Sequence, residues 1–274
     1  MEQKPMVTYH RQGHIGYLTL NRPDKRNAMS VTFWHSLGRA VELAAADDEA
    51  RVLILRGEGK SFCAGLDLSP ENELFAAVMS PEGKSAAMKT KLYHEIRRVQ
   101  NIHTAFERLP MPTIAAVHSH CLGAGLELAV CADFRYASAD ALFALPEAKL
   151  SFITDVGGLQ RLQRLLGTAQ AREIAFRGHR FDAQKALQIG LINQILPDKA
   201  ALDQAVLAVA QEIAANPPLA VRGAKDVFLY DLDVSMEESL AYNCARSVMI
   251  LPNDDMNEAI GAYLEGRTGD FKGA

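Results

Sequence analysis

Two glycine-rich segments, 61–68 and 122–127, each follow a strand-like apolar run. Turns of this kind direct free backbone N–H groups outward, and a pair of such donors can hold the oxygen of a polarised carbonyl. Three carboxylates lie in or after the second segment, namely Glu127, Glu147 and Asp155. Oxyanion donors together with several acids indicate proton chemistry beside a carbonyl.

The second glycine segment has both a functional and a structural interpretation. A helix that begins at about Gly123 would point its first N–H groups and the positive end of its dipole at a bound oxygen. Ala124 is then the natural donor, and Glu127 lies three residues later on the same helical face. Alternatively, the glycines permit close packing and Glu127 is a first-turn acid favoured by the dipole. Asp155 could likewise cap the next helix, and Glu147 could be a solvated loop residue.

Several other chemistries find little support in the sequence. A dinucleotide-binding G-x-G-x-x-G pattern fails because Leu128 occupies the last glycine position, and no P-loop or G-x-S-x-G elbow occurs. His118 and His120 have no third ligand at a recognisable spacing, so we expect no metal site. Cys63 and Cys121 lack a nearby basic partner in sequence, so a thiol nucleophile is not expected.

Composition restricts the class of protein. A chain of 274 residues that is 49% hydrophobic can bury a large core, and a formal charge of −4 argues against a nucleic-acid partner. The four cysteines show no CxxC spacing, which favours reduced thiols. No apolar run reaches the roughly 20 residues of a membrane span, and we see neither a targeting segment nor a peroxisomal terminus. We therefore expect a cytoplasmic enzyme that does not bind membranes.

The order of the elements predicts an α/β architecture with a helical end. Apolar runs at 52–55 and 113–117 are typical of strands buried on both faces, and helical spacing begins after the possible N-cap Ser30. Between these strands we expect a polar loop over 69–86, which could face a substrate, and then a helix over 87–109. Strands and helices alternate up to residue 197, and successive helices occupy 198–274.

Taken together, these segments resemble the crotonase (enoyl-CoA hydratase/isomerase) superfamily over nearly the whole chain. The resemblance rests on Leu20–Pro23 with Asn27–Met29, both glycine segments, Asp133 with Tyr136, Pro146-Glu147, Gly157-Gly158, Gln160–Leu162 and Ala186–Leu191. It implies a core of repeated ββα units over residues 1–197. It also implies a C-terminal helical trimerisation region over 198–274, in a homotrimer or a dimer of trimers.

The resemblance also implies the substrate and the site. The substrate would be an acyl-CoA thioester whose oxygen is held by the N–H groups of Leu66 and Ala124. CoA would enter as part of the substrate, without a separate cofactor or a metal. The positions implied for contact with CoA or substrate are Ala64, Asp67, Leu68, Lys25 and Arg26.

The acids indicate which reaction is favoured. Glu127 and Glu147 match the two glutamates with which hydratases activate water for addition to a 2-enoyl-CoA. Asp155 stands where ordinary hydratases have glycine, and the run from Thr154 to Leu162 is similar to that of dienoyl-CoA isomerases. In that subfamily, two acids shuttle a proton to convert 3,5-dienoyl-CoA into 2,4-dienoyl-CoA. We favour this isomerisation, with hydration as the alternative, since the best-known isomerases carry aspartate where this chain has Glu127.

Non-enzymatic alternatives are also consistent with the resemblance. A hydratase homologue binds RNA through a lysine-rich first helix, but residues 30–50 contain no lysine and only one arginine, Arg39. A crotonase-like protein that binds CoA without turnover is the other non-enzymatic reading.

Overall fold

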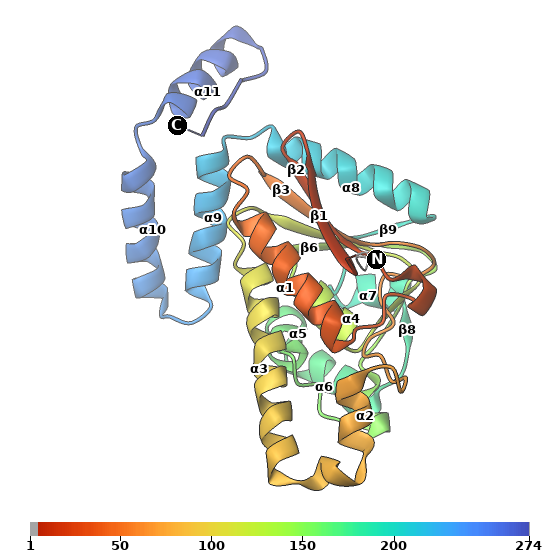
Figure 1. Cartoon of the computed structure of the whole chain (residues 1–274). Coiled ribbons are helices and arrows are strands. Elements are labelled where there is room, and N and C mark those ends of the chain that lie inside the picture. The colour runs from red at the N-terminus through yellow and green to blue at the C-terminus, as the bar shows by residue number, and fades with distance from the viewer. Residues whose placement is uncertain (1–4, 274) are drawn as a thin grey trace.

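The computed structural model describes residues 5–273 and contains one large and one small β-sheet (Figure 1). The large sheet has the order β1-β2-β3-β4-β6-β9, with β1 antiparallel to β2 and all other neighbours parallel. Its strands are β1 (Val7–Gln12), β2 (Ile15–Leu20), β3 (Val52–Gly57), β4 (Thr113–Val117), β6 (Phe134–Ser138) and β9 (Gln194–Leu196). The small sheet has the order β5-β7-β8 and consists of β5 (His120–Leu122), β7 (Leu142–Ala144) and β8 (Phe181–Asp182).

Helices cover both faces of the large sheet. The α-helices are α1 (Val31–Ala45), α2 (Glu73–Met79), α3 (Ala86–Glu107), α4 (Ala124–Ala129), α5 (Gly158–Leu166), α6 (Thr168–Arg177), α7 (Ala183–Gln188), α8 (Lys199–Ala214), α9 (Pro218–Asp231), α10 (Met236–Ile250) and α11 (Asp254–Glu265). On β3, Leu53 and Leu55 pack in the cluster that contains α1 and α3, whereas Val52 and Ile54 pack against α8. The prediction that the short apolar runs are buried on both faces is therefore confirmed.

The ββα repeat is visible where the glycine segments lie. The chain passes from β4 through β5 into α4, and from β6 through β7 toward α5, so β4 and β6 are each followed by a strand of the small sheet. The carboxyl ends of parallel strands meet at one edge of a sheet, where α/β proteins place their ligands. The fold thus brings the first turn of α4 and the segment before α5 to the same region.

Three local expectations differ from the structure. The stretch 69–86 is not a loop but contains α2 and a 3₁₀ turn at Pro81–Lys84, because Leu74, Phe75 and Val78 provide an apolar helical face. The strand expected over 191–196 is shorter and begins at Gln194. The cap of α5 is Gly157 rather than Asp155, so the structure does not use Asp155 as a helix cap.

The C-terminal helices separate into two groups. Helix α8 packs on the sheet, while α9, α10 and α11 extend to one side of it (Figure 1). Buried Lys225 on α9 donates to Asp133 at 2.8 Å and to the Met111 carbonyl at 2.9 Å, which anchors this arm to the core. Within residues 5–273, no helix is long and apolar enough to cross a membrane.

Candidate active site

The two glycine segments are in direct contact. The Cys63 N–H donates to the His120 carbonyl at 2.8 Å, and the Leu122 N–H donates to the Cys63 carbonyl at 3.0 Å. Gly65 has φ +92°, and a Cβ there would lie 2.8 Å from the Leu122 carbonyl oxygen. A Cβ at Gly125 would lie 2.7 Å from Cys63. Only glycine allows the two backbones to approach this closely.

The contact places two N–H groups on one cavity. Leu66 and Ala124 both line it, and in the described part of the chain neither N–H donates to a protein acceptor. Ala124 is the first residue of α4, so its N–H is one of the donors that a helix leaves without an internal partner. The geometry is suited to an oxygen that gains negative charge.

Asn27 holds the first glycine segment in place. Its side-chain amide donates to the carbonyls of Glu58, Ser61 and Phe62 at 2.8–3.0 Å, and its side-chain oxygen accepts from the Arg22 N–H at 2.8 Å. Its φ of +56° is in the left-handed region, which asparagine tolerates better than most residues. In the sequence Asn27 was only a landmark, because the three carbonyls to which it donates lie more than 30 residues away.

The cavity between the glycine segments, α2 and α3 has a volume of about 200 Å³. It brings together most of the residues expected at the site. Those that line it are Glu127, Glu147, Asp155, Leu66, Ala124, Ala64 and Leu68. The other lining residues are mostly apolar, which suits an acyl chain.

Asp67, Lys25 and Arg26 do not line the cavity. The Asp67 carboxylate is buried and pairs with Arg22 at 2.6 Å, so its contacts hold the first glycine segment. Lys25 lies 3.8 Å from Glu71 on the surface. The carbonyl of Arg26 accepts from the N–H of the cavity residue Ala64 at 3.0 Å, so the backbone of Arg26 lies next to the cavity wall.

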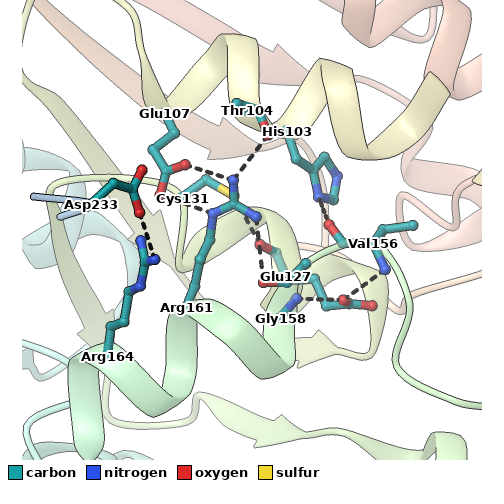
Figure 2. Close-up of polar contacts among 11 residues, drawn as sticks. His103, Thr104, Glu107, Glu127, Cys131, Val156, Gly158, Arg161, Arg164 and Asp233 are labelled. Atoms are coloured by element: carbon teal, nitrogen blue, oxygen red, sulfur yellow. Dashed lines mark hydrogen bonds and ion pairs between the residues drawn. The ribbon is translucent and has the colours of Figure 1, made fainter. Parts of the chain in front are cut away.

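Glu127 is the most deeply buried of the three acids, with 2% of its surface exposed. Its Oε2 accepts from the N–H groups of Val156 at 3.1 Å and Gly158 at 2.7 Å (Figure 2). A Cβ at Gly158 would lie 2.5 Å from Glu127 Cγ, so the approach requires glycine. Burial, reinforced by the charges of Glu147 and Asp155, raises the pKa of Glu127 to about 8 despite these hydrogen bonds.

Glu147 and Asp155 complete the acidic side of the cavity. The Thr154 hydroxyl donates to Glu147 at 3.3 Å, and a Cβ at Gly123 would lie 2.5 Å from Glu147 Oε1. Glu147 is therefore next to the residue that precedes the Ala124 donor. Asp155 is exposed as a residue, yet it borders the cavity. Desolvation raises the pKa of each of these two carboxyls, and for Glu147 the charge of Asp155 adds to the effect.

We predict that Glu127→Gln removes a pH-dependent loss of stability. The folded-state pKa of about 8 lies above the ordinary value of 4.5, so the unfolded chain binds fewer protons between these pH values. The contribution of Glu127 is therefore fully present below pH 4.5 and is lost as the pH rises to 8. A shift of this size corresponds to about 5 kcal/mol, so the variant should gain about that much relative to the wild type as the pH rises through this window. Denaturant unfolding at several pH values measures this, and a constant difference between the two proteins would contradict it.

Some cavity residues were not found by sequence analysis. Trp34 on α1, Asn72 at the start of α2 and Glu95 on α3 all line the cavity. The available signal was the placement of Asn72 before the apolar spacing of Leu74, Phe75 and Val78, which is an N-terminal helix pattern.

The histidines and thiols considered earlier have structural contacts. One His118 ring nitrogen lies 3.0 Å from the Gly59 carbonyl oxygen, and His120 lies 3.2 Å from the Ser61 hydroxyl. The Cys63 thiol donates to the Asn27 carbonyl, and burial raises its pKa to about 12. A thiol with this pKa is a poor nucleophile at neutral pH.

Comparison with known proteins shows similarity along the whole chain. The sequence profile of a family described as enoyl-CoA hydratase/isomerase matches residues 10–274. A peroxisomal Delta(3,5)-Delta(2,4)-dienoyl-CoA isomerase of Arabidopsis thaliana is 35% identical, over 97% of this chain and 95% of that protein. A 2,3-dehydroadipyl-CoA hydratase of Escherichia coli is also 35% identical, over 96% of this chain and 97% of that protein.

The fold is shared with solved structures. An enoyl-CoA hydratase from Bacillus anthracis superposes with a TM-score of 0.88 at 31% identity, covering 98% of this chain and all of that chain. The expected crotonase-like α/β fold with a helical C-terminal region is confirmed. Relatives named for both reactions are similar to this chain, so the choice between the reactions rests on the acids of its own cavity.

Proposed function

This chain belongs to the enoyl-CoA hydratase/isomerase family, and we propose that it converts 3,5-dienoyl-CoA into 2,4-dienoyl-CoA by a carboxylate proton shuttle. The single observation that carries the proposal is Asp155. Asp155 borders the cavity together with Glu147, and the N-cap of the helix that follows is Gly157 rather than Asp155. A second carboxylate at the cavity can exchange a proton with a carbon remote from the thioester.

The thioester oxygen would accept from the N–H groups of Leu66 and Ala124. As a proton leaves C2, negative charge moves onto this oxygen, and two fixed donors stabilise it more in the transition state than in the ground state. The adenine and pantetheine parts of CoA would pass Ala64 and Leu68. Lys25 and Arg26 are exposed beside that wall, where they could approach the phosphates.

The proton path follows from the place of each acid. We assign the base to Glu147, because it lies against Gly123 and thus next to the carbonyl site. Ionised Glu147 takes a proton from C2, and a double bond forms between C2 and C3. The C3–C4 double bond shifts to C4–C5, and the electrons of the C5–C6 double bond accept a proton at C6 from Asp155. Exchange with water then returns Glu147 to the ionised and Asp155 to the protonated form.

Hydration of a 2-enoyl-CoA is the second candidate. Glu127 and Glu147 line the same cavity, as a hydratase pair would, and the Escherichia coli relative is named as a hydratase. Asp155 favours isomerisation over hydration because its carboxylate occupies space that a reacting water would need. The two reactions differ in product, so one assay separates them.

The test is turnover of matched 2-trans-enoyl-CoA and 3,5-dienoyl-CoA thioesters by the wild type and by Asp155→Asn. We expect the wild type to produce the conjugated 2,4-dienoyl absorbance, and the variant to do so about 100-fold more slowly, because water at this exposed position partly replaces the acid. Loss of the 2-enoyl band with an unaffected variant would instead establish a hydratase. Inactivity of the wild type on both thioesters would overturn both candidates.

We also propose that the protein assembles as a homotrimer or a dimer of trimers through its C-terminal helices. Large apolar side chains are exposed on these helices, including Phe228, Met236, Leu240, Val248, Tyr263 and Leu264. A face of this kind is typical of an interface between copies of a chain. A monomer in sedimentation at micromolar concentration would contradict the proposal.

A further inference from the structure

In the segment that carries Asp155 and binds Glu127, two successive peptide carbonyls lie within hydrogen-bond distance of side chains from one helix, α3. Segment 155–158 bears the Asp155 carboxyl and supplies the Val156 and Gly158 N–H groups that hold Glu127. It has no regular structure before α5 begins at Gly158. Its position relative to Glu127 must therefore be set by contacts from elsewhere in the fold.

Helix α3 supplies these contacts from residues Gln100, His103, Thr104 and Glu107, which we call the clamp face. Their spacing of three, one and three residues places all four on one side of the helix. Gln100 donates to the Asp155 carbonyl at 2.5 Å, and His103 Nδ1 lies 3.1 Å from the Val156 carbonyl oxygen. Each of the first two peptide carbonyls of the segment is thus held from α3.

The other two residues of the clamp face, Thr104 and Glu107, act through Arg161 on α5. The Arg161 guanidinium donates to both carboxylate oxygens of Glu107, at 2.9 and 2.6 Å, and to the Thr104 hydroxyl at 3.3 Å (Figure 2). Its remaining terminal nitrogen donates to the Gly157 carbonyl at 3.3 Å. A bidentate pair of this kind fixes direction as well as distance, so it locks the turn that presents the Gly158 N–H to Glu127.

We propose that the clamp face is a positioning element, which fixes segment 155–158 so that Glu127 and Asp155 keep the relative placement that proton transfer needs. The same helix continues past the cavity, where Leu92, Ile96 and Val99 line its wall. A single rigid helix therefore supports both the acyl chain and the acids. None of the four clamp residues lines the cavity.

The consequence for catalysis rests on the proposed function, but the structural consequence does not. If the clamp is loosened, the acids move relative to the substrate while the apolar wall remains. Misplacement by about 1 Å can lower the rate about 100-fold, and it has less effect on binding. The amides of Val156 and Gly158 should also open more often, whatever reaction the enzyme catalyses.

The experiment compares Arg161→Lys and Glu107→Gln with the matched control Arg164→Lys. Arg164 lies one turn further along α5 and pairs with Asp233 on the surface at 2.9 Å (Figure 2). Arg161→Lys keeps the charge and removes the bidentate geometry, whereas Glu107→Gln keeps the shape and removes the ion pair. The readouts are kcat and KM for whichever thioester the wild type converts, and amide hydrogen exchange of the free enzyme.

We expect both clamp variants to lower kcat about 10- to 100-fold with KM within about threefold of the wild type. Exchange at Val156 and Gly158 should become about tenfold faster, while Leu53 and Leu55 in the sheet keep wild-type rates. These sheet amides separate a local loosening from a general loss of stability. The control should match the wild type in every readout.

Two results would overturn the proposal. If both clamp variants keep the wild-type kcat and the wild-type rates of amide hydrogen exchange, segment 155–158 is held without α3. Equal acceleration of exchange in the sheet and in the segment would show that the ion pair contributes only to overall stability. Inactivity of the wild type itself would instead remove the proposed function, and the exchange measurement would still decide whether the clamp exists.

Discussion

Glu147→Gln is expected to lower kcat for 3,5-dienoyl-CoA by about 10³- to 10⁴-fold, the upper range for loss of a general base. Glutamine preserves the size of the side chain and can still accept from the Thr154 hydroxyl, which donates to Glu147 at 3.3 Å. It cannot take up a proton from C2. Because the cavity wall is unchanged, KM should change by less than about tenfold. Absorbance of the 2,4-dienoyl product measures the effect.

The raised pKa of Glu147 is the reason for this large effect. A carboxylate at its ordinary pKa is a weak base at neutral pH, whereas desolvation by burial raises the pKa of Glu147 toward the working pH. The exposed helical residue Glu42 provides the control, since Glu42→Gln removes a carboxylate from a position remote from the cavity. Turnover by Glu147→Gln within tenfold of the wild type would rule out Glu147 as the base.

The sequence was most informative where function depends on local backbone. The glycine segments could be recognised because a single stretch of chain contains the strand, the turn and the donor. Ala124 could be inferred as a donor from local sequence, whereas Leu66 followed from the family resemblance, and the structure places both residues on the cavity. The short strands were equally easy to predict, because a strand that is buried on both faces has an uninterrupted apolar run in its sequence.

What could not be predicted depends on contacts between residues far apart in the chain. Asp67 was expected beside CoA, but its carboxylate binds Arg22, which lies 45 residues earlier. The clamp face on α3 contacts a segment more than 50 residues later, and nothing in its local composition indicates this. Helix α2 was missed because its apolar face is short and lies between polar residues, and the helix-start pattern at Asn72 was the only local signal for it.

Ala124→Pro is expected to lower kcat about 10²- to 10³-fold, because it deletes one of the two proposed oxyanion donors. Proline is well tolerated as the first residue of a helix, where the missing N–H has no helical partner. The preceding Gly123 has ψ −124°, far from the α region that proline disfavours in its neighbour. The bond from the Glu127 N–H to the Gly123 carbonyl can remain, so α4 should keep its place.

A matched proline separates the loss of the donor from the general effect of the ring. Lys199 is the first residue of α8, and its cap Asp198 has the extended backbone, ψ 179°, that proline favours in the residue before it. Lys199→Pro should therefore retain wild-type turnover and a similar melting temperature. If Ala124→Pro turns over within tenfold of this control, the Ala124 N–H does not stabilise the transition state. If it loses activity but the folded variant still binds CoA thioesters, the remaining Leu66 donor is sufficient for binding and insufficient for catalysis.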